Sequence, residues 1–268
     1  MKNLYDSDSI LYDYVGYVNY DRIIKGVAHR GFSSIAPENT LPAYRLAKEL
    51  GFYYVETDIS FTSDNVPVCL HDSTINRTSN GSGSISSMTY DQVRQYDFGS
   101  WKNACYEGTK IPSFEEFIRF CRNVGLHPYI EIKNNETYSQ AQIESLIDTV
   151  KAFGMKGKVS WISFSLSYLN YVKNYDNEAR LGYVTSSVSE SIINSTNGLK
   201  TGNNDVFLDT SSMAGASVTL CKNANIPMEV WTIDSENSII NANPYITGFT
   251  SNTILAGRLL YNTGMSEV

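Results

Sequence analysis

The stretch YYVETDISFTSDNVPVCL, residues 53–70, contains two strand-like runs separated by a short polar link. The first run ends at about residue 61 and the second covers residues 66–70, so only the four residues TSDN connect them. Parallel strands need a crossover of about a dozen residues or more, which this link does not provide. The two runs are therefore predicted to form an antiparallel hairpin.

The rest of the chain alternates short β-branched runs with stretches of helical periodicity. The predicted strands cover residues 26–29, 53–59, 128–132, 158–163, 180–184, 205–209, 228–233 and 246–250. Helices with clear end signals are predicted at 41–50 after Thr40, at 114–124 after Ser113, and within 139–154. Eight strands alternating with helices over about 240 residues predict an α/β fold, the (β/α)8 TIM barrel.

The hairpin does not fit this alternation, so it is assigned to a small insertion after the second barrel strand. The insertion covers about residues 62–110 and consists of the hairpin and the Gly/Ser-rich segment behind it. Residues 1–24 are rich in Tyr and Asp and precede the first clear strand, and we interpret them as an N-terminal arm. The barrel domain is then predicted to be residues 25–268.

Composition narrows the classes of partner. The 268 residues are 42% hydrophobic, enough for one sizeable core. The net charge of −7 argues against nucleic acid as the main partner, but it does not exclude a small phosphate ester held by local cations. No apolar run of about 18 residues exists, so no membrane span is expected. The acidic N-terminus fits no signal peptide. The four scattered cysteines are expected to be buried small hydrophobes.

Acidic residues share faces on two predicted strands. Side chains alternate along a strand, which places Glu56 and Asp58 on one face, and Glu131 and Lys133 on one face of the next strand. A solvated edge strand would explain the first pair alone but not both patterns, and buried carboxylates are costly unless they meet a partner. Three carboxylates at one rim favour a hard divalent cation between them, Ca²⁺ or Mg²⁺ rather than zinc.

The three histidines differ in position. His29 ends the first predicted strand and His71 ends the hairpin, so both lie at the rim where the strands lead into loops. His127 begins a strand at the opposite end of the barrel and is expected to be structural. Two histidines can act as base and acid in one reaction. Arg30 offers a fork for phosphate oxygens and Lys133 a point charge, so the rim is interpreted as a phosphate-ester site.

A series of short motifs carries a resemblance to a known family. In order they are AHRG at 28–31, APENT at 36–40, VETDISFTSD at 55–64, HD at 71–72, INRT at 75–78, IPSFEEF at 111–117, YIEIK at 129–133, VWTID at 230–234 and ITGFTSN at 246–252. Together they resemble the glycerophosphodiester phosphodiesterases, over about residues 26–252. That family has a TIM-barrel fold with a small insertion after strand 2, which agrees with the hairpin argument.

The resemblance implies roles for individual residues. His29 and His71 match the general acid/base pair, without an indication of which acts first as the base. Glu56, Asp58 and Glu131 match the divalent-metal ligands, usually of Ca²⁺ or Mg²⁺. Two cations, Arg30 and Lys133, match the phosphate-binding positions, and Trp231 matches a wall of the substrate cleft. In the family a neighbouring glycerol hydroxyl is thought to attack phosphorus, giving a cyclic phosphate that water then opens.

Two departures from the family pattern are visible. The link TSDN stands where relatives commonly have a Lys and a Gly, and Asn252 stands where many have an Asp. Both are expected to affect local turns or the choice of alcohol, and neither is expected to touch the proposed chemistry.

The leading hypothesis is metal-dependent hydrolysis of glycerophosphodiesters to glycerol phosphate and an alcohol. The substrate is either a small deacylated phospholipid or the glycerol-phosphate backbone of teichoic acids, and the protein is either cytoplasmic or part of a phage tail or cell-surface assembly. The alternatives are a phospholipase C-like or sphingomyelinase D-like phosphodiesterase, or a catalytically silent barrel that binds glycopolymers. A silent barrel should have lost a histidine or a metal ligand, and none is missing.

Overall fold

The computed structural model describes residues 16–19, 22–134 and 137–254. Eight parallel strands form a closed barrel, with β2 pairing with both β10 and β3. In order around the barrel the strands are β2 (Arg22–Ala28), β3 (Tyr54–Phe61), β5 (His127–Ile132), β6 (Ser160–Ser163), β7 (Arg180–Thr185), β8 (Val206–Thr210), β9 (Met228–Val230) and β10 (Ile246–Ser251).

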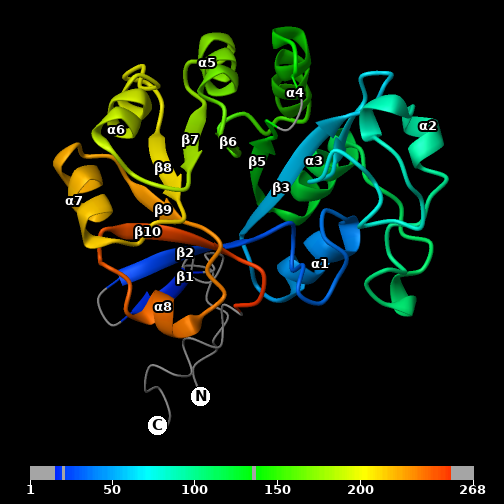
Figure 1. Cartoon of the computed structure of the whole chain (residues 1–268), viewed down its shortest axis with the longest axis horizontal. Helices are drawn as coiled ribbons and strands as arrows, with labels where there is room; N and C mark the ends of the chain where they lie inside the picture. The colour runs from blue at the N-terminus through cyan, green and yellow to red at the C-terminus, as the bar shows by residue number, and fades with distance from the viewer. Residues whose placement is uncertain (1–15, 20–21, 135–136, 255–268) are drawn as a thin grey trace, which may run out of the picture.

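Helices follow the strands and surround them on the outside (Figure 1). They are α1 (Leu41–Glu49), α3 (Phe114–Val124), α4 (Gln140–Ala152), α5 (Leu166–Tyr175), α6 (Glu190–Asn197), α7 (Gly215–Asn223) and α8 (Glu236–Ile240). Large apolar clusters fill the layer between strands and helices. This is the TIM-barrel architecture expected from the sequence, and each of the eight predicted strands is present.

The helix caps follow the sequence signals with one difference. Ser113 caps α3 in a reciprocal capping box with Glu116, and Gly125 ends the helix in the left-handed region. Thr40 is the N-cap residue of α1, but its hydroxyl donates to the carbonyl of Pro37 and makes no cap hydrogen bond.

The N-terminal boundary lies earlier than the strand prediction. Strand β2 begins at Arg22, and a short strand β1 (Gly16–Asn19) pairs with it in antiparallel fashion. Part of the segment interpreted as an arm therefore forms an extra hairpin on the barrel. The rest of that arm, residues 1–15 and 20–21, lies outside the described residues.

The insertion between β3 and α3 contains the predicted hairpin. Strand β4 (Pro67–Cys69) pairs antiparallel with the end of β3. It is followed by the 3₁₀ turns η2 (Ile85–Ser87) and η3 (Ala104–Tyr106) and by the short helix α2 (Tyr90–Val93). A small apolar cluster around Val68, Ile75 and Phe98 gives the insertion its own core, and Figure 1 shows it beside the barrel, on the side of α1 and α3.

Three of the four cysteines are buried and free, as expected, whereas Cys105 in η3 is exposed and so departs from that expectation. Among the described residues, no helix combines the length and apolar composition that a membrane crossing requires.

The lower part of the barrel interior holds a charged layer. The carboxylate of Glu229 accepts hydrogen bonds from Lys25 Nζ at 2.7 Å, Arg180 Nη2 at 2.7 Å and the Tyr129 hydroxyl at 3.0 Å. These residues come from β9, β2, β7 and β5, which are alternate strands around the barrel. Alternate strands supply each layer of a TIM-barrel interior, and such layers are usually apolar. Here an ion cluster takes that place.

We predict that Glu229→Gln lowers the free energy of unfolding by about 3 kcal/mol, because it leaves two largely buried cations without their counter-charge. Arg180 and Lys25 outweigh the effect of burial and lower the pKa of Glu229 from 4.5 to about 2. The stabilisation is therefore complete above pH 4.5 and declines as the pH falls towards 2. The free energies of unfolding of the wild type and of Glu229→Gln are compared by urea unfolding between pH 3 and 7.

The matched control is Glu178→Gln, which removes an exposed carboxylate paired with Lys156. That variant should unfold like the wild type. An equal stability of Glu229→Gln and wild type at pH 7 would contradict the prediction.

Candidate active site

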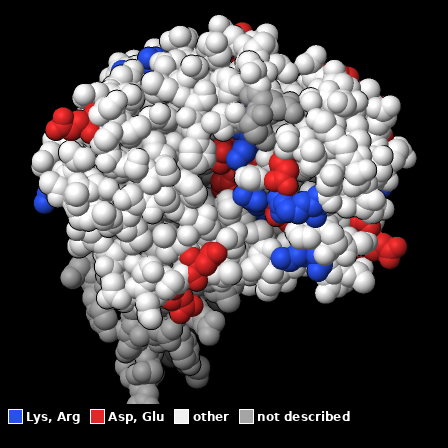
Figure 2. All heavy atoms as spheres, in the orientation of Figure 1, with Lys and Arg blue, Asp and Glu red and all other residues white. Residues whose placement is uncertain are grey.

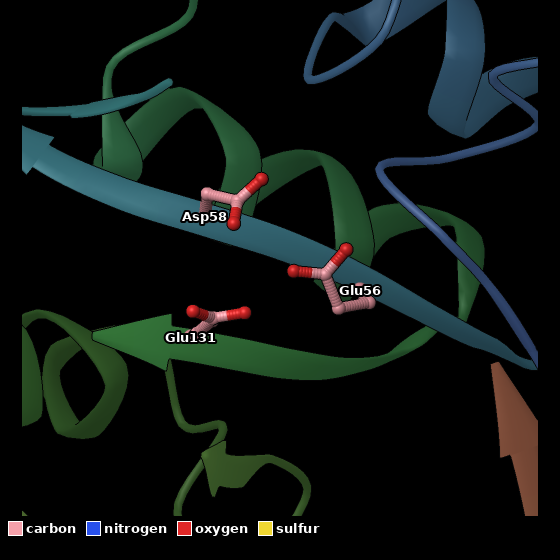
Figure 3. A group of neighbouring side chains, drawn as sticks. All are labelled: Glu56, Asp58 and Glu131. Carbon is pink, nitrogen blue, oxygen red and sulfur yellow. The ribbon is translucent and has the colours of Figure 1, made fainter. Parts of the chain in front are cut away.

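Three buried carboxylates converge at the C-terminal end of the barrel strands. Glu56 and Asp58 lie on β3 and Glu131 on β5, and the strand register pairs Asp58 directly with Glu131. Figure 3 shows the three carboxylates on the same face of the two strands. One oxygen from each carboxylate lies within 4.8 Å of the corresponding oxygens of the other two. The alternation argued from the sequence thus brings these side chains together.

Two cations neighbour the acidic group. Lys133 Nζ lies 2.8 Å from Glu131 Oε1 and 3.4 Å from Asp58 Oδ1, and Arg30 Nε lies 3.2 Å from Asp58 Oδ2. Burial disfavours the charge on Asp58, but Arg30 and Lys133 outweigh it and hold the pKa of Asp58 well below its ordinary value. Burial and then the charge of Asp58 raise the pKa of both Glu56 and Glu131.

The donor set fits a hard divalent cation. Glu56 Oε1 and Asp58 Oδ1 are buried and have no hydrogen-bond partner among the described residues. Oxygens bound to Ca²⁺ or Mg²⁺ at about 2.0–2.6 Å lie no more than about 4–5 Å apart, which the triad satisfies. A cation among them would offset the mutual repulsion that raises the pKa values of the two glutamates.

His29 follows β2 and reaches the same site. Its Nδ1 lies 2.8 Å from Asn252 Oδ1, and its Nε2 lies 3.9 Å from Glu56 Oε2. Asn252 donates its Nδ2 to Asp234 Oδ2, which orients its oxygen towards the imidazole. Nδ1 therefore carries the proton and Nε2 the lone pair. Burial, aided by Arg30, lowers the pKa of His29 to about 4, so the ring is neutral at pH 7.

This contact corrects one expectation. Asn252 was expected to affect only a turn or the choice of alcohol, but it touches the imidazole of His29 directly. Residues 29 and 252 are brought together because β2 and β10 are neighbours in the closed barrel, with Ser251 paired with Ala28.

The loop after His29 aims Arg30 at the acidic group. Arg30 adopts a left-handed backbone conformation with φ of 56°, and its backbone N–H donates to Glu56 Oε2 at 2.8 Å. Its guanidinium donates to Glu38 Oε1 at 2.8 Å. Asn39 donates to Asp58 Oδ2 at 2.8 Å. The Pro-Glu-Asn-Thr segment therefore holds both Arg30 and Asp58 in place.

His71 lies at the rim on the insertion, two residues after β4. Its Nδ1 is 2.7 Å from Asp72 Oδ1. Arg77 donates to Asp72 Oδ2 at 2.8 Å and to Glu38 Oε2 at 2.6 Å. The pKa of Asp72 is lowered to about 2, mainly by the hydrogen bonds that Arg77 donates to its carboxylate. A continuous chain of hydrogen bonds and ion pairs thus joins His71 on the insertion to Arg30 on the barrel through Asp72, Arg77 and Glu38.

Most of the site residues proposed from the sequence open into one pocket of about 240 Å³. Figure 2 shows a hollow near the middle of this face with acidic and basic side chains in and beside it. The pocket is lined by His29, Arg30, Glu56, His71, Glu131, Lys133, Ile162, Phe164, Val184, Asp209, Trp231, Thr232 and Thr250. Trp231 follows β9, and its ring meets that of Phe164 edge to face at 5.5 Å. Of the eight residues proposed from the sequence, seven line the pocket, and Asp58 lies immediately behind Arg30 and Lys133.

Sequence reasoning assigned no role to Asn252, Asp72, Arg77 or Asp209. Asp72 and Arg77 belong to motifs quoted above, and an acidic residue directly after His71 was an available signal. Asp209 ends the run DVFLD, which reads as an ordinary strand end. Only the closed barrel shows that it faces the pocket.

A protein-family model, described as the glycerophosphoryl diester phosphodiesterase family, matches residues 29–250. Among curated proteins, the glycerophosphodiester phosphodiesterase of Caldanaerobacter subterraneus subsp. tengcongensis is 31% identical over 156 residues, 58% of this chain and 64% of that protein. The human glycerophosphodiester phosphodiesterase 1 is 39% identical over 115 residues, 42% of this chain and 34% of that protein. Each match thus spans less than two thirds of the relative's length.

Solved structures give the same architecture over almost the whole chain. A phosphodiesterase of Oleispira antarctica, solved in complex with the product sn-glycerol-3-phosphate, has a TM-score of 0.76 at 25% identity, covering 88% of this chain and 96% of that one. A glycerophosphodiester phosphodiesterase of Agrobacterium tumefaciens has a TM-score of 0.70 at 22% identity, covering 86% and 96%. The second likeness concerns the fold alone.

We predict that Ca²⁺ or Mg²⁺ stabilises the protein and that Glu131→Gln removes most of this effect. At a cation concentration 100 times the Kd the stabilisation is about 2.7 kcal/mol. For a chain of this size it raises the Tm by about 5–10 °C. Differential scanning calorimetry with each cation and with EDTA measures the shift.

Glu115→Gln, which removes an exposed carboxylate paired with Arg119, is the control and should keep the full shift. The absence of any cation-dependent shift in the wild type, or an unchanged shift in Glu131→Gln, would show that the triad is not a cation site.

Proposed function

The chain belongs to the glycerophosphoryl diester phosphodiesterase family, and we propose that it hydrolyses glycerophosphodiesters to glycerol phosphate and an alcohol with the help of a divalent cation. The observation that carries the proposal is one pocket lined by two histidines, two cations and two carboxylates of the buried triad, whose third member, Asp58, neighbours both cations. The phosphodiesterase of Oleispira antarctica, which binds sn-glycerol-3-phosphate as its product, supports the substrate class.

The proposed division of roles follows from the side chains around the pocket. Arg30 and Lys133 bind the phosphate oxygens, one as a fork and the other as a point charge. Glu56, Asp58 and Glu131 hold Ca²⁺ or Mg²⁺, which when bound neutralises charge on the phosphodiester and orients it. Trp231 forms a wall for the organic part of the substrate.

Hydrogen bonding suggests which histidine removes the proton. His29 has its Nδ1–H fixed on Asn252, so Nε2 is available to accept a proton from the attacking hydroxyl. His71 has its Nδ1 hydrogen-bonded to the carboxylate of Asp72, which orients the imidazole ring at the rim. We propose His29 as the base of the first step and His71 as the acid that protonates the leaving alcohol.

An extended substrate is the second part of the proposal. Trp101, on the insertion, is 38% exposed, and the neighbouring Lys102 donates to the carbonyl of Ser33 at 2.7 Å. Ser33 Oγ in turn donates to Asn252 Oδ1 at 3.0 Å. An exposed aromatic ring with an adjacent ammonium group therefore stands just outside the loop that carries His29. This surface suits a further repeat of a glycerol-phosphate polymer such as teichoic acid, which would place the protein at a cell surface or in a phage tail.

The alternative readings have less support. A phospholipase C-like or sphingomyelinase D-like activity has no counterpart among the relatives described above. For a catalytically silent barrel, an expected sign is a missing histidine or carboxylate at the site, and both sets are complete.

His29→Ala and His71→Ala are each expected to lower kcat/KM for glycerophosphocholine by at least about 100-fold, because each removes a proton carrier. EDTA should abolish the activity, and Ca²⁺ or Mg²⁺ should restore it. Release of glycerol 3-phosphate in a coupled assay measures both effects.

The third histidine supplies the control. His127 lies at the other end of the barrel and its Nε2 is 3.0 Å from Ser160 Oγ, so His127→Gln should keep the wild-type rate. Metal-dependent turnover that survives in both rim variants would refute the assigned roles.

For the polymer, Trp101→Ala is expected to lower the rate of glycerol phosphate release from purified poly(glycerol phosphate) by about three- to five-fold, the size of one exposed contact. The rate on glycerophosphocholine should not change. Tyr175→Ala removes an exposed ring at the end of α5 and is the control. No release from the polymer with any cation would exclude teichoic acid.

A further inference from the structure

The wall of the pocket opposite the charged groups contains a buried carboxyl group that has no assigned partner. Asp209 lies on β8, lines the pocket and is 3% exposed. Its Oδ1 has no hydrogen-bond partner among the described residues. A buried polar atom is costly to leave without a hydrogen bond, so such an atom at a pocket wall points to a ligand group that pairs with it.

A second unpaired atom lies on the same wall. The indole Nε1 of Trp231 is also buried without a hydrogen-bond partner in the described structure. Strands β8 and β9 are neighbours with Asp209 paired to Glu229, and Trp231 lies two residues beyond Glu229, towards the pocket that both Asp209 and Trp231 line. Around them the wall is apolar, with Ile162, Phe164 and Val184.

The chemistry of the two atoms selects the ligand group. The indole N–H is only a donor, and a carboxyl oxygen accepts or, when protonated, donates. A hydroxyl group satisfies both, because it offers one hydrogen and two lone pairs. A quaternary ammonium group does not, because it cannot accept from the indole.

We propose that Asp209 and Trp231 bind the terminal hydroxyl of the glycerol moiety and so make the enzyme selective for glycerol esters over simple alkyl esters. The inference rests on the proposed function. The phosphate is held at the charged side of the pocket by Arg30 and Lys133, so the three-carbon glycerol unit extends across the pocket to the opposite wall. The vicinal hydroxyl then remains near phosphorus and the histidines, and the terminal hydroxyl reaches Asp209.

The electrostatics of this wall agree with a neutral carboxyl group. Burial, together with the charges of Glu229 and Glu131, raises the pKa of Asp209 well above its ordinary value. A protonated carboxyl group can donate to a hydroxyl oxygen as well as accept from it.

The test compares two substrates in the wild type, Asp209→Leu and Asp209→Asn. The substrates are glycerophosphocholine and its analogue in which propane-1,2-diol replaces glycerol, so that only the terminal hydroxyl is missing. We expect the wild type to prefer glycerophosphocholine by at least ten-fold in kcat/KM, since a site built for a hydroxyl rejects the analogue that lacks it. Asp209→Leu should lower this ratio about ten-fold. Asp209→Asn, whose amide also donates and accepts, should retain most of it.

Asp205→Asn is the matched control, because it makes the same change at an exposed position just before the same strand, at the opposite end of the barrel. Its substrate ratio should equal that of the wild type. A ratio in Asp209→Leu equal to that of the wild type would overturn the proposal. If Asp209→Leu does not fold, the wild type alone still tests the proposal. A wild-type kcat/KM that is nearly the same for glycerophosphocholine and for its propane-1,2-diol analogue would overturn it.

A third substrate separates the hydroxyl from a cation as the partner of Asp209. In it, 3,3-dimethylbutanol replaces choline, which removes the positive charge and keeps the shape. If both Asp209 variants lose a preference for choline and keep the preference for the terminal hydroxyl, Asp209 binds the ammonium group and the proposal is wrong.

Product binding distinguishes a failure of this inference from a failure of the proposed function. Isothermal titration of sn-glycerol 3-phosphate and of propane-1,2-diol 1-phosphate requires no turnover. If the protein hydrolyses no ester with any cation, the proposed function is refuted. The subsite would still be supported if the wild type binds glycerol 3-phosphate more tightly than propane-1,2-diol 1-phosphate and Asp209→Leu does not. Equal affinity of the wild type for the two phosphates would overturn it.

Discussion

Asp58 and Glu131 are register partners on neighbouring parallel strands, so two buried carboxylates stand side by side where burial disfavours their charge. Most of the surrounding structure serves to make this arrangement tolerable. Arg30 and Lys133 approach from two sides, Asn39 donates to Asp58, and the backbone of Arg30 donates to Glu56. Even so, Glu56 Oε1 and Asp58 Oδ1 accept no hydrogen bond from the described residues. Such a group of carboxylates could hold a cation between them.

The alternation of side chains made much of the fold and site predictable. Two carboxylates two residues apart on one strand must share a face, and a four-residue link must be a hairpin, whatever the tertiary structure. Contacts between distant segments were not predictable in this way. Asn252 meets His29 because the barrel closes between β10 and β2, and Asp209 faces the pocket because β8 lies across the barrel from β3. Neither residue carries a local signal of its place.

The insertion is part of the site as well as an addition to the barrel. It carries His71, and Arg77 links it through Glu38 to Arg30. The two histidines therefore lie on different parts of the chain, one at the end of a barrel strand and one on an insertion with its own apolar core. Ion pairs from Arg77 to Glu38 and from Glu38 to Arg30 hold the insertion against the loop that follows His29.

The ion cluster inside the lower barrel has a consequence for how such a sequence can change over time. Glu229 on β9 accepts hydrogen bonds from Lys25, Arg180 and Tyr129, which lie on three other strands. Loss of the charge at Glu229, Lys25 or Arg180 alone would leave the remaining charged groups without full compensation in a poorly solvated interior. Replacement by an apolar layer therefore needs concerted substitutions on strands far apart in the sequence. The charged residues of the cluster are therefore expected to be retained together or replaced together in sequences that descend from this one.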